Sequence, residues 1–203
     1  MSGDLLIATR NVGKAKELAA LFDGRCRSLA DLPDDGFEPD ETGRTFRDNA
    51  CLKAVGYARH LACPVLADDS GLAVDALGGK PGVHSARFAN MHNAGSGDEA
   101  NNALLLRRLA NVPDDRRGAR FVCVLALADA TGRILMTAEG DVRGTILREP
   151  RGSNGFGYDP LFFVPSLRKT TAELSPEDKA AISHRGQASR RLRDLLSRHP
   201  LAV

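Results

Sequence analysis

Residues 65–72 read Val-Leu-Ala-Asp-Asp-Ser-Gly-Leu, an apolar run that leads directly into two adjacent carboxylates. The run Val65-Leu66-Ala67 predicts a short buried strand. Two carboxylates directly after such a strand are costly to bury unless ions or hydrogen bonds satisfy them. Their place at the end of an apolar strand therefore indicates a metal site or a catalytic site.

The geometry of strands decides whether Asp68 and Asp69 can share one site. Successive side chains on a regular strand point to opposite faces. The two aspartates converge only if the strand ends there, which Ser70-Gly71 permits, so two equal ligands require a turn at Ser70. Mg²⁺ prefers oxygen ligands and commonly takes one or two carboxylates together with substrate phosphates. The alternative is that one or both carboxylates cap a turn or pair with an arginine.

Outward from this stretch, helical and strand patterns mix without strict alternation, which predicts an α/β or α+β fold with a mixed sheet. The expected elements are a strand over 4–9, a helix over 11–22, a helix from Thr45 towards Leu61, a helix that begins in a capping box at 96–99 and runs through Leu109, two hairpin strands over 120–130 and 133–146 that turn at Thr131-Gly132, and a last helix from Ser175 to about Ser197.

The bulk composition is that of an ordinary globular protein. The chain has 203 residues, 42% of them hydrophobic and 27% charged, enough for one large domain or two interleaved lobes. A formal net charge of +2 argues against a general nucleic-acid binder. The longest apolar run, 121–128, is far shorter than the roughly 20 residues of a membrane-spanning helix. We read no secretory signal and expect a cytoplasmic protein with no membrane partner and with four reduced cysteines.

Residues 9–14, Thr-Arg-Asn-Val-Gly-Lys, join the first predicted strand to the first helix. Exposed N–H groups at such a helix start favour an anion, and Lys14 adds a full positive charge. The segment is not a Walker A loop, because Ala8 and Ala15 stand where that motif needs Gly and Ser or Thr. The alternative is an ordinary helix start with a solvated lysine.

Residues 152–160 form a glycine-rich loop that contains both Phe156 and Tyr158. Three glycines let the backbone approach a ligand closely, and aromatic rings beside an acid suit stacking on a planar base. The order of the glycines is not that of the Rossmann fingerprint. The alternative is a plain structural turn.

Two further groups of polar residues are candidates for the same chemistry. Glu41 lies in a loop-like acidic segment ahead of the helix that carries Lys53, and it could reach a metal. Later in the chain, Lys179 precedes Ser183 by one helical turn, and His184 and Arg185 follow as donors that suit a carbonyl oxygen or a phosphate. In both groups the common alternative is a solvated surface.

Taken together, these segments resemble the inosine triphosphate pyrophosphatase family, whose members are also described as dITP/XTP pyrophosphatases. Seven blocks match in the family's order and span almost the whole chain, which is far more specific than any one of them. The blocks are 9–14, 41–46 with 49–50 and 53–54, 67–72, 81–87, 155–160, 171–174 and 183–188.

The resemblance implies a Mg²⁺-dependent hydrolase that converts a purine nucleoside triphosphate to its monophosphate and pyrophosphate, with a preference for ITP, dITP and XTP. It also implies an elongated mixed β-sheet flanked by helices, one domain over 1–203 with two interleaved lobes around a central cleft, and a homodimer. Asp69 matches the metal-associated general base, with Asp68 beside it and Glu41 as a further metal ligand. The matching substrate-binding positions are Thr9, Arg10, Asn11, Val12, Gly13, Lys14, Lys53, Ser70, Phe156, Gly157, Tyr158, Asp159, Lys179, His184 and Arg185.

Two residues depart from the family pattern: Arg10, where a small residue is common, and His84, where an aromatic residue is more usual. For base choice, we expect His184 and Arg185 to favour the 6-oxo group of a deaminated purine, because ATP would leave buried donors unpaired. Three alternatives stay open. They are a nucleotide-sensing module that does not hydrolyse, a pyrophosphatase for modified pyrimidine nucleotides, and an RNA-binding domain, which the near-neutral charge disfavours.

Overall fold

The computed structural model describes residues 5–22 and 26–198. Within these residues the strands form a seven-stranded sheet in the order β2-β1-β3-β4-β5-β6-β7. β1 pairs in parallel with β2 and β3, whereas β6 pairs antiparallel with β5 and β7, so the sheet is mixed. This confirms the predicted mixed α/β fold. The strands are β1 (Leu5–Ala8), β2 (Cys26–Ser28), β3 (Val65–Val74), β4 (Gly118–Ala128), β5 (Ile134–Ile146), β6 (Phe162–Val164) and β7 (Lys169–Thr170).

The helices begin where the sequence places capping residues. Thr45 accepts a hydrogen bond from the N–H of Asp48 at the start of α2, and Ser175 accepts one from Asp178 at the start of α4. Such caps satisfy backbone donors that have no partner inside the helix. The helices are α1 (Val12–Leu21), α2 (Phe46–Leu61), α3 (Gly97–Arg108), α4 (Pro176–Ile182) and α5 (His184–Arg198). Among the described residues, none of the helices has both the length and the apolar character required to cross a membrane.

The chain divides into two compact units that are interleaved in sequence. Unit 1 comprises Met1–Asp69, Cys123–Gly140 and His184–Val203, and unit 2 comprises Ser70–Val122 and Asp141–Ser183. The strands β3, β4 and β5 each contribute residues to both units.

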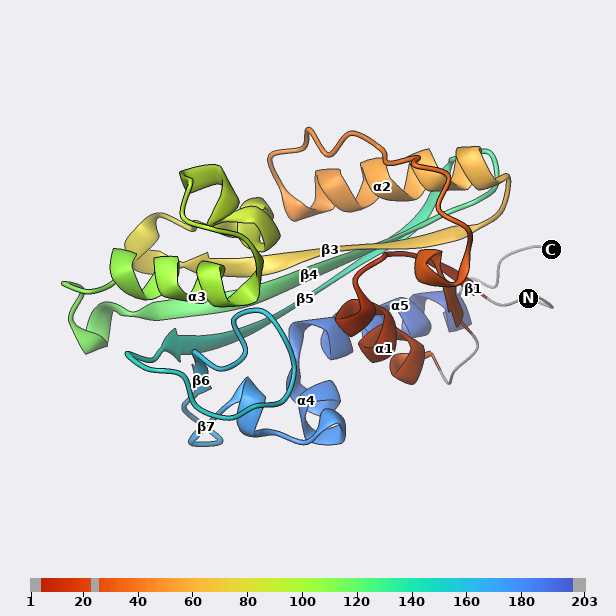
Figure 1. The fold of residues 1–203 in the computed structure, drawn as a ribbon. Coiled ribbons are helices and arrows are strands. Elements are labelled where there is room, and N and C mark those ends of the chain that lie inside the picture. The colour runs from red at the N-terminus through yellow and green to blue at the C-terminus, as the bar shows by residue number, and fades with distance from the viewer. Residues whose placement is uncertain (1–4, 23–25, 199–203) are drawn as a thin grey trace. The chain divides into compact units, whose positions relative to one another are not determined.

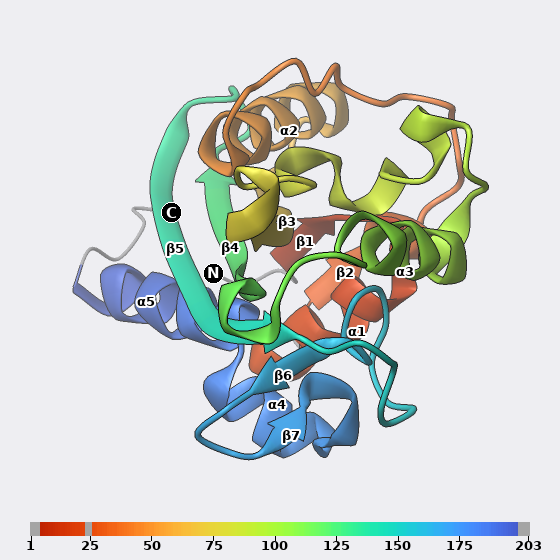
Figure 2. The same ribbon diagram turned by 90° about the vertical axis from the view of Figure 1, so that its left-hand side faces the viewer.

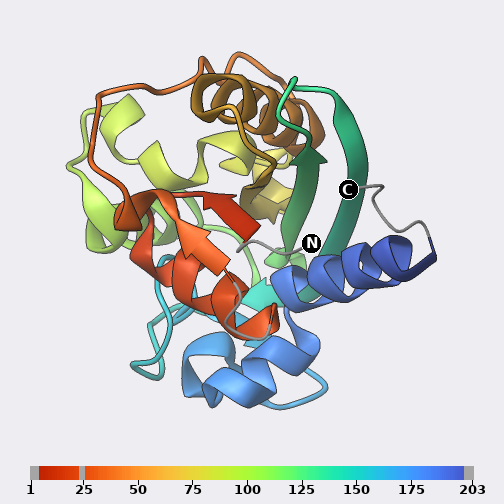
Figure 3. The same ribbon diagram turned by 90° about the vertical axis from the view of Figure 1, so that its right-hand side faces the viewer.

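The core of unit 1 lies on both faces of its strands. On one face α2 packs through Ala50, Ala54 and Tyr57, and on the other α1 and α5 pack through Leu18 and Leu192 (Figures 1 and 3). Residues of the strands alternate between these two clusters, as the twofold period of a strand requires. Leu6, Val65, Ala67, Val124 and Ala126 belong to the α2 side, and Leu5, Ile7, Leu66, Cys123 and Leu125 belong to the α1 and α5 side.

The core of unit 2 is built around the far ends of the same strands. Leu72 and Val74 of β3 belong to one buried cluster with Leu105 of α3 and Phe162 of β6. The rings of Phe121 and Phe162 lie 4.4 Å apart between centroids. Figure 2 shows β6, β7 and α4 next to one another in this unit. Leu72 and Val74, in the second half of β3, are therefore as buried as residues 65–67 in its first half.

Two predicted elements differ from the structure. β3 does not end at the aspartates but runs on to Val74, because Leu72 and Val74 are buried and the N–H of Leu72 bonds to the Ser85 hydroxyl at 2.8 Å. The single last helix is in fact two helices, since Ser183 adopts extended dihedrals (φ −65, ψ 158) between α4 and α5. Asp4, the predicted first residue of the opening strand, lies outside the described residues.

The predicted capping box at 96–99 is wrong in detail although α3 begins where expected. The Ser96 side chain makes no capping hydrogen bond among the described residues, and Asp98 instead accepts a bond from the N–H of Gly157 at 2.7 Å. The predicted hairpin between β4 and β5 is confirmed, with Gly132 at φ +82 in its turn.

Candidate active site

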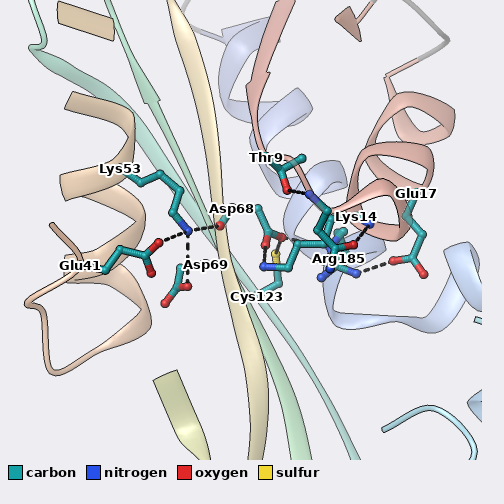
Figure 4. Close-up of polar contacts among 10 residues, drawn as sticks. Thr9, Lys14, Glu17, Glu41, Lys53, Asp68, Asp69, Cys123 and Arg185 are labelled. Atoms are coloured by element: carbon teal, nitrogen blue, oxygen red, sulfur yellow. Dashed lines mark hydrogen bonds and ion pairs between the residues drawn. The ribbon is translucent and has the colours of Figure 1, made fainter. Parts of the chain in front are cut away.

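The side chains of Asp68 and Asp69 lie on opposite faces of β3 (Figure 4). Asp69 follows Val65 and Ala67 in the alternation and points to the α2 side, whereas Asp68 follows Leu66 and points to the side of α1 and α5. The convergence of both carboxylates on one site, which the sequence left conditional, therefore does not occur. It required the strand to end at Ser70, and the strand continues.

Asp69 is buried beside Lys53 and Glu41. The Nζ of Lys53 lies 2.9 Å from Oε1 of Glu41, 3.8 Å from Oδ1 of Asp69 and 3.3 Å from the main-chain oxygen of Asp68. The second oxygen of Asp69, Oδ2, is buried and has no hydrogen-bond partner among the described residues. A buried carboxylate oxygen without a partner is costly and indicates a ligand or a catalytic task.

Burial dominates the protonation of Asp69. It raises the pKa of Asp69 to about 7, against the opposing charges of Lys53 and Lys14. Burial alone would lower the pKa of Lys53, but the charges of Asp69 and Glu41 outweigh it and raise the pKa of Lys53. Asp69 therefore titrates near neutral pH beside a fully charged ammonium, as suits a general base.

Glu41 is held in place by the segment that precedes α2. The Asn49 side chain accepts a hydrogen bond from the N–H of Gly43 at 2.8 Å, and a Cβ at Gly43 would lie 2.5 Å from that same oxygen. Further back, Phe37 stacks on His60 with ring centroids 4.0 Å apart. The loop that carries Glu41 is thus packed along α2, which also carries Lys53.

The donor set around Asp69 fits a hard divalent cation. No group of three or more His, Cys, Asp or Glu side chains in the described part of the chain is arranged to hold a metal ion. Asp69 and Glu41 offer carboxylates to one shared ammonium, and Asp69 keeps one oxygen without a partner. Mg²⁺ is usually bound through one or two carboxylates, with water and substrate phosphates completing its shell.

Asp68 has a different environment. Its Oδ1 accepts a hydrogen bond from Lys14 at 2.6 Å, and its Oδ2 accepts bonds from Nε of Arg185 at 3.0 Å and from the thiol of Cys123 at 3.2 Å. Arg185 also pairs with Glu17. Burial would raise the pKa of Asp68, but Lys14 and Arg185 outweigh it and hold this pKa well below its usual range.

These contacts correspond to the alternative left open by the sequence, in which a carboxylate pairs with an arginine. Asp68 faces away from Asp69 and Glu41, so its position does not support its predicted place as a ligand in the same metal site. Arg185, predicted to contact the base, is buried and binds Asp68 and Glu17.

The predicted anion-binding loop forms the start of α1. The Asn11 side chain caps the helix by accepting a hydrogen bond from the N–H of Lys14 at 2.9 Å, and Thr9 accepts one from Asn11 at 3.1 Å. Val12 is 58% exposed, so the loop is open to solvent there. Arg10 donates to the Leu29 oxygen at 3.2 Å and pairs with Asp34 at 2.8 Å. The extra charge of Arg10 is thereby held by the segment that follows β2.

In unit 2 the glycine-rich loop is organised around Asp159. Its Oδ2 accepts hydrogen bonds from the N–H of Phe156 at 2.8 Å and from Lys179 at 2.5 Å, and its Oδ1 accepts one from Thr171 at 2.8 Å. Lys179 also lies over the Phe156 ring, 5.1 Å from its centroid. A Cβ at Gly155 would lie 2.1 Å from Asp159 Oδ2, so only glycine fits there.

Tyr158 does not present its ring as predicted. The ring belongs to the buried core of unit 2, and its hydroxyl donates to the Ser85 oxygen at 2.9 Å. Burial, with a smaller contribution from Asp98, raises the pKa of Tyr158. The stacking role predicted for this buried ring is therefore wrong. Phe156, in contrast, is only half-buried.

The predicted site residues fall into the two units as follows. Unit 1 holds Thr9, Arg10, Asn11, Val12, Gly13, Lys14, Glu41, Lys53, Asp68, Asp69, His184 and Arg185, and unit 2 holds Ser70, Phe156, Gly157, Tyr158, Asp159 and Lys179. Sequence reasoning missed Glu17 and Cys123. Glu17 stands one helical turn after Lys14, a spacing that places both on one helix face. Cys123 lies in an apolar strand and gave no signal.

Residues 5–195 match the sequence model of the Ham1 family. The chain belongs to the Ham1 family. This Ham1 member is 55% identical over 191 residues to the dITP/XTP pyrophosphatase of an Exiguobacterium species, covering 93% of this chain and 94% of the relative. It is 49% identical over 194 residues to the dITP/XTP pyrophosphatase of Escherichia coli K12, covering 95% and 97%. These matches confirm the resemblance predicted from the seven blocks.

Solved Ham1 structures are similar to this chain along almost their full length. The Ham1 protein of Staphylococcus aureus has a TM-score of 0.81 at 42% identity, with 96% of this chain and 98% of that chain covered. A HAM1 protein from Coxiella burnetii has a TM-score of 0.81 at 39% identity, with 97% and 99% covered.

Proposed function

We propose that this chain is a nucleoside triphosphate pyrophosphatase that hydrolyses deaminated purine nucleotides to their monophosphates and pyrophosphate, and so cleanses the nucleotide pool. The substrates would be ITP, dITP, XTP and dXTP. The observation that carries the proposal is Asp69, a buried carboxylate with one unpartnered oxygen and a pKa raised to about 7, beside Lys53 and Glu41. Relatives named dITP/XTP pyrophosphatases support the substrate class.

In this proposal Asp69 and Glu41 would hold Mg²⁺, and Asp69 would accept a proton from the attacking water. When bound, Mg²⁺ supplies positive charge that polarises the phosphoryl oxygens. Asp69 fits the base because its Oδ2 has no partner to displace and its pKa is close to neutral pH. Attack at the α-phosphorus forms a bond to the water oxygen and breaks the bond to the oxygen that bridges the α- and β-phosphorus. That oxygen leaves with pyrophosphate, and the proton of the water passes to Asp69.

Two lysines would neutralise the charge that develops on the phosphates. The Nζ of Lys53 sits between Glu41 and Asp69, and Lys14 lies in the first turn of α1, where backbone N–H groups favour anions. Asp68 orients Lys14 at 2.6 Å. Arg10, whose ion pair with Asp34 is exposed, would add a further positive charge at the start of α1.

We assign base recognition to the Phe156–Asp159 loop of unit 2, with Lys179 fixing Asp159 and covering Phe156. A 6-oxo purine presents an acceptor where adenine presents a donor, so a site built of donors rejects ATP. His184, buried at the start of α5, is proposed as one such donor. Arg185 serves instead to hold Asp68 and Glu17.

The proposal is tested by pyrophosphate release with Mg²⁺ across dITP, ITP, XTP, GTP, ATP and a modified pyrimidine triphosphate. We expect fast release from dITP, ITP and XTP and slow release from ATP. Binding without release would favour a nucleotide-sensing module, and a preference for the pyrimidine would favour that substrate class. Equal rates on all purines would contradict the selective function.

We also propose the setting in which the enzyme works. Because free nucleotides are its proposed substrates, we propose that it acts in the cytoplasm, without a nucleic-acid or membrane partner. We also propose, from the family resemblance, that it is a homodimer. Sedimentation equilibrium of the full chain checks the dimer, because a mass of one chain at micromolar concentration would contradict it.

A further inference from the structure

The main chain of Gly157, in the middle of the Phe156–Asp159 loop, is held from a different element of unit 2. Its N–H donates to Oδ2 of Asp98 at 2.7 Å, and its carbonyl oxygen accepts a hydrogen bond from Nδ2 of Asn102 at 2.9 Å. Asp98 and Asn102 stand four residues apart on α3 and so share one face of that helix. One helix face therefore binds both polar groups of a single loop residue.

This clamp is separate from the contacts that hold the ends of the loop. Asp159, itself held by Lys179, accepts a hydrogen bond from the N–H of Phe156. Tyr158 is held through its hydroxyl, which donates to the main-chain oxygen of Ser85. Gly157 lies between these anchors at φ +63, and a Cβ there would meet nothing within 4 Å. Gly157 thus has no side chain to hold it, and the two bonds from α3 restrain the peptide groups on either side of its Cα.

We propose that Asp98 and Asn102 are positioning residues that fix the loop for the nucleobase. The inference rests on the proposed function, because it takes Phe156 to lie against the base. By holding the peptide that joins Phe156 to Gly157 and the peptide after it, the clamp sets the main-chain direction of Phe156 and so the place of its ring. The clamp acts on binding of the base and leaves the carboxylate chemistry of unit 1 unchanged.

The kinetic test compares Asp98→Ala, Asp98→Asn and Asn102→Ala with Glu99→Ala, an exposed acid in the same first turn of α3. Asp98→Ala should raise KM for dITP by about tenfold, the worth of one hydrogen bond to a charged group, with kcat little changed. Asp98→Asn keeps a carbonyl acceptor for the Gly157 N–H and should restore most of the KM. Glu99→Ala removes the same charge from the helix start and should behave as wild type.

The two clamp residues should also depend on each other. Because both act on the main chain of one residue, Gly157, the double variant Asp98→Ala with Asn102→Ala should raise KM by less than the product of the single effects. An unchanged KM in Asp98→Ala, or Asp98→Asn as impaired as Asp98→Ala, would overturn the positioning role. A fall in kcat with KM unchanged would also overturn it.

A second measurement separates failure of the clamp from failure of the proposed function. Amide hydrogen exchange of the peptide that contains Gly157, measured in the full chain without nucleotide, should be faster in Asp98→Ala and unchanged in Glu99→Ala. Unchanged exchange in Asp98→Ala would overturn the clamp whether or not the protein hydrolyses dITP. If exchange is faster in Asp98→Ala but the wild type releases no pyrophosphate, the clamp stands, and the failure is confined to the proposed function and to the role in base binding.

Discussion

Asp68 and Asp69 are adjacent in sequence, yet one is enclosed by cations and the other keeps an unpartnered oxygen. Asp68 binds Lys14 at 2.6 Å and Arg185 at 3.0 Å on one face of β3, while Asp69 lies 3.8 Å from Lys53 on the other. The same residue type therefore has opposite pKa shifts, well below the usual value for Asp68 and raised to about 7 for Asp69. Strand alternation places the two carboxylates in different environments.

Asp68→Asn should destabilise the protein, because it removes the buried carboxylate that Lys14 and Arg185 share inside unit 1. Breaking a buried ion pair by removing one member costs about 3–5 kcal/mol. Urea denaturation at pH 7 measures the loss as a lower midpoint with an unchanged slope. Asp34→Asn, which removes the exposed partner of Arg10, is the control and should cost about 1 kcal/mol or less. Equal midpoints for the two variants would contradict the distinction.

The metal-free protein should lose stability as pH rises, through Asp69. A carboxyl whose folded pKa is about 7 and whose ordinary value is 3.8 contributes stability below pH 3.8 that is lost as pH rises through 7. Asp69→Asn lacks this titration and should be the more stable protein at pH 8, by up to about 4 kcal/mol. Thermal unfolding in EDTA at pH 5 and pH 8 checks it. A difference between the two proteins that does not grow with pH would refute this assignment.

Lys53→Met should shift the acid limb of the pH–rate profile to higher pH. Lys53 is the largest charge that lowers the pKa of Asp69, so its removal makes Asp69 harder to deprotonate. The profile of kcat/KM for dITP at saturating Mg²⁺ reports this shift. Lys16→Met, which removes an exposed charge from α1, should leave the limb in place. An acid limb at the same pH in Lys53→Met as in wild type would show that the pKa of Asp69 does not determine that limb.

Gly155→Ala should disrupt the glycine-rich loop much more than the strain of an alanine at positive φ explains. Its Cβ would lie 2.1 Å from Oδ2 of Asp159, so the carboxylate must leave Phe156 or Lys179. Gly36→Ala is a matched control, since Gly36 has φ +76 but nothing within 4 Å. Both variants carry the cost of a positive φ, about 1–2 kcal/mol, and only Gly155→Ala should raise KM for dITP as well. Equal behaviour would contradict the close contact.

The sequence predicted the local elements well because their signals are local. Thr45 and Ser175 cap helices where expected, and the hairpin turns at Gly132. The end of β3 was mispredicted because Ser70-Gly71 looks like a turn when read alone. The strand continues to Val74 because Leu72 and Val74 are buried in the core of unit 2. Such burial depends on tertiary packing, which the local sequence does not reveal.

The candidate site was predicted in composition but not in arrangement. Lys53 could not be assigned to a helix face from spacing, and the structure places it on Glu41 and Asp69. Arg185 was expected at the base because a guanidinium suits a carbonyl oxygen. In the structure it instead donates to Asp68, which lies more than a hundred residues away in sequence. Pairings across such separations leave no pattern in one sequence.

The central claim is that Asp69 performs the chemistry, and the most direct measurement is Mg²⁺-dependent pyrophosphate release from dITP by wild type and Asp69→Asn. Asparagine keeps the size of the side chain but cannot accept the proton, so turnover should fall by roughly 10²- to 10⁴-fold. The circular dichroism spectrum and the urea midpoint of the variant should show it folded. Near wild-type turnover by folded Asp69→Asn would contradict the account.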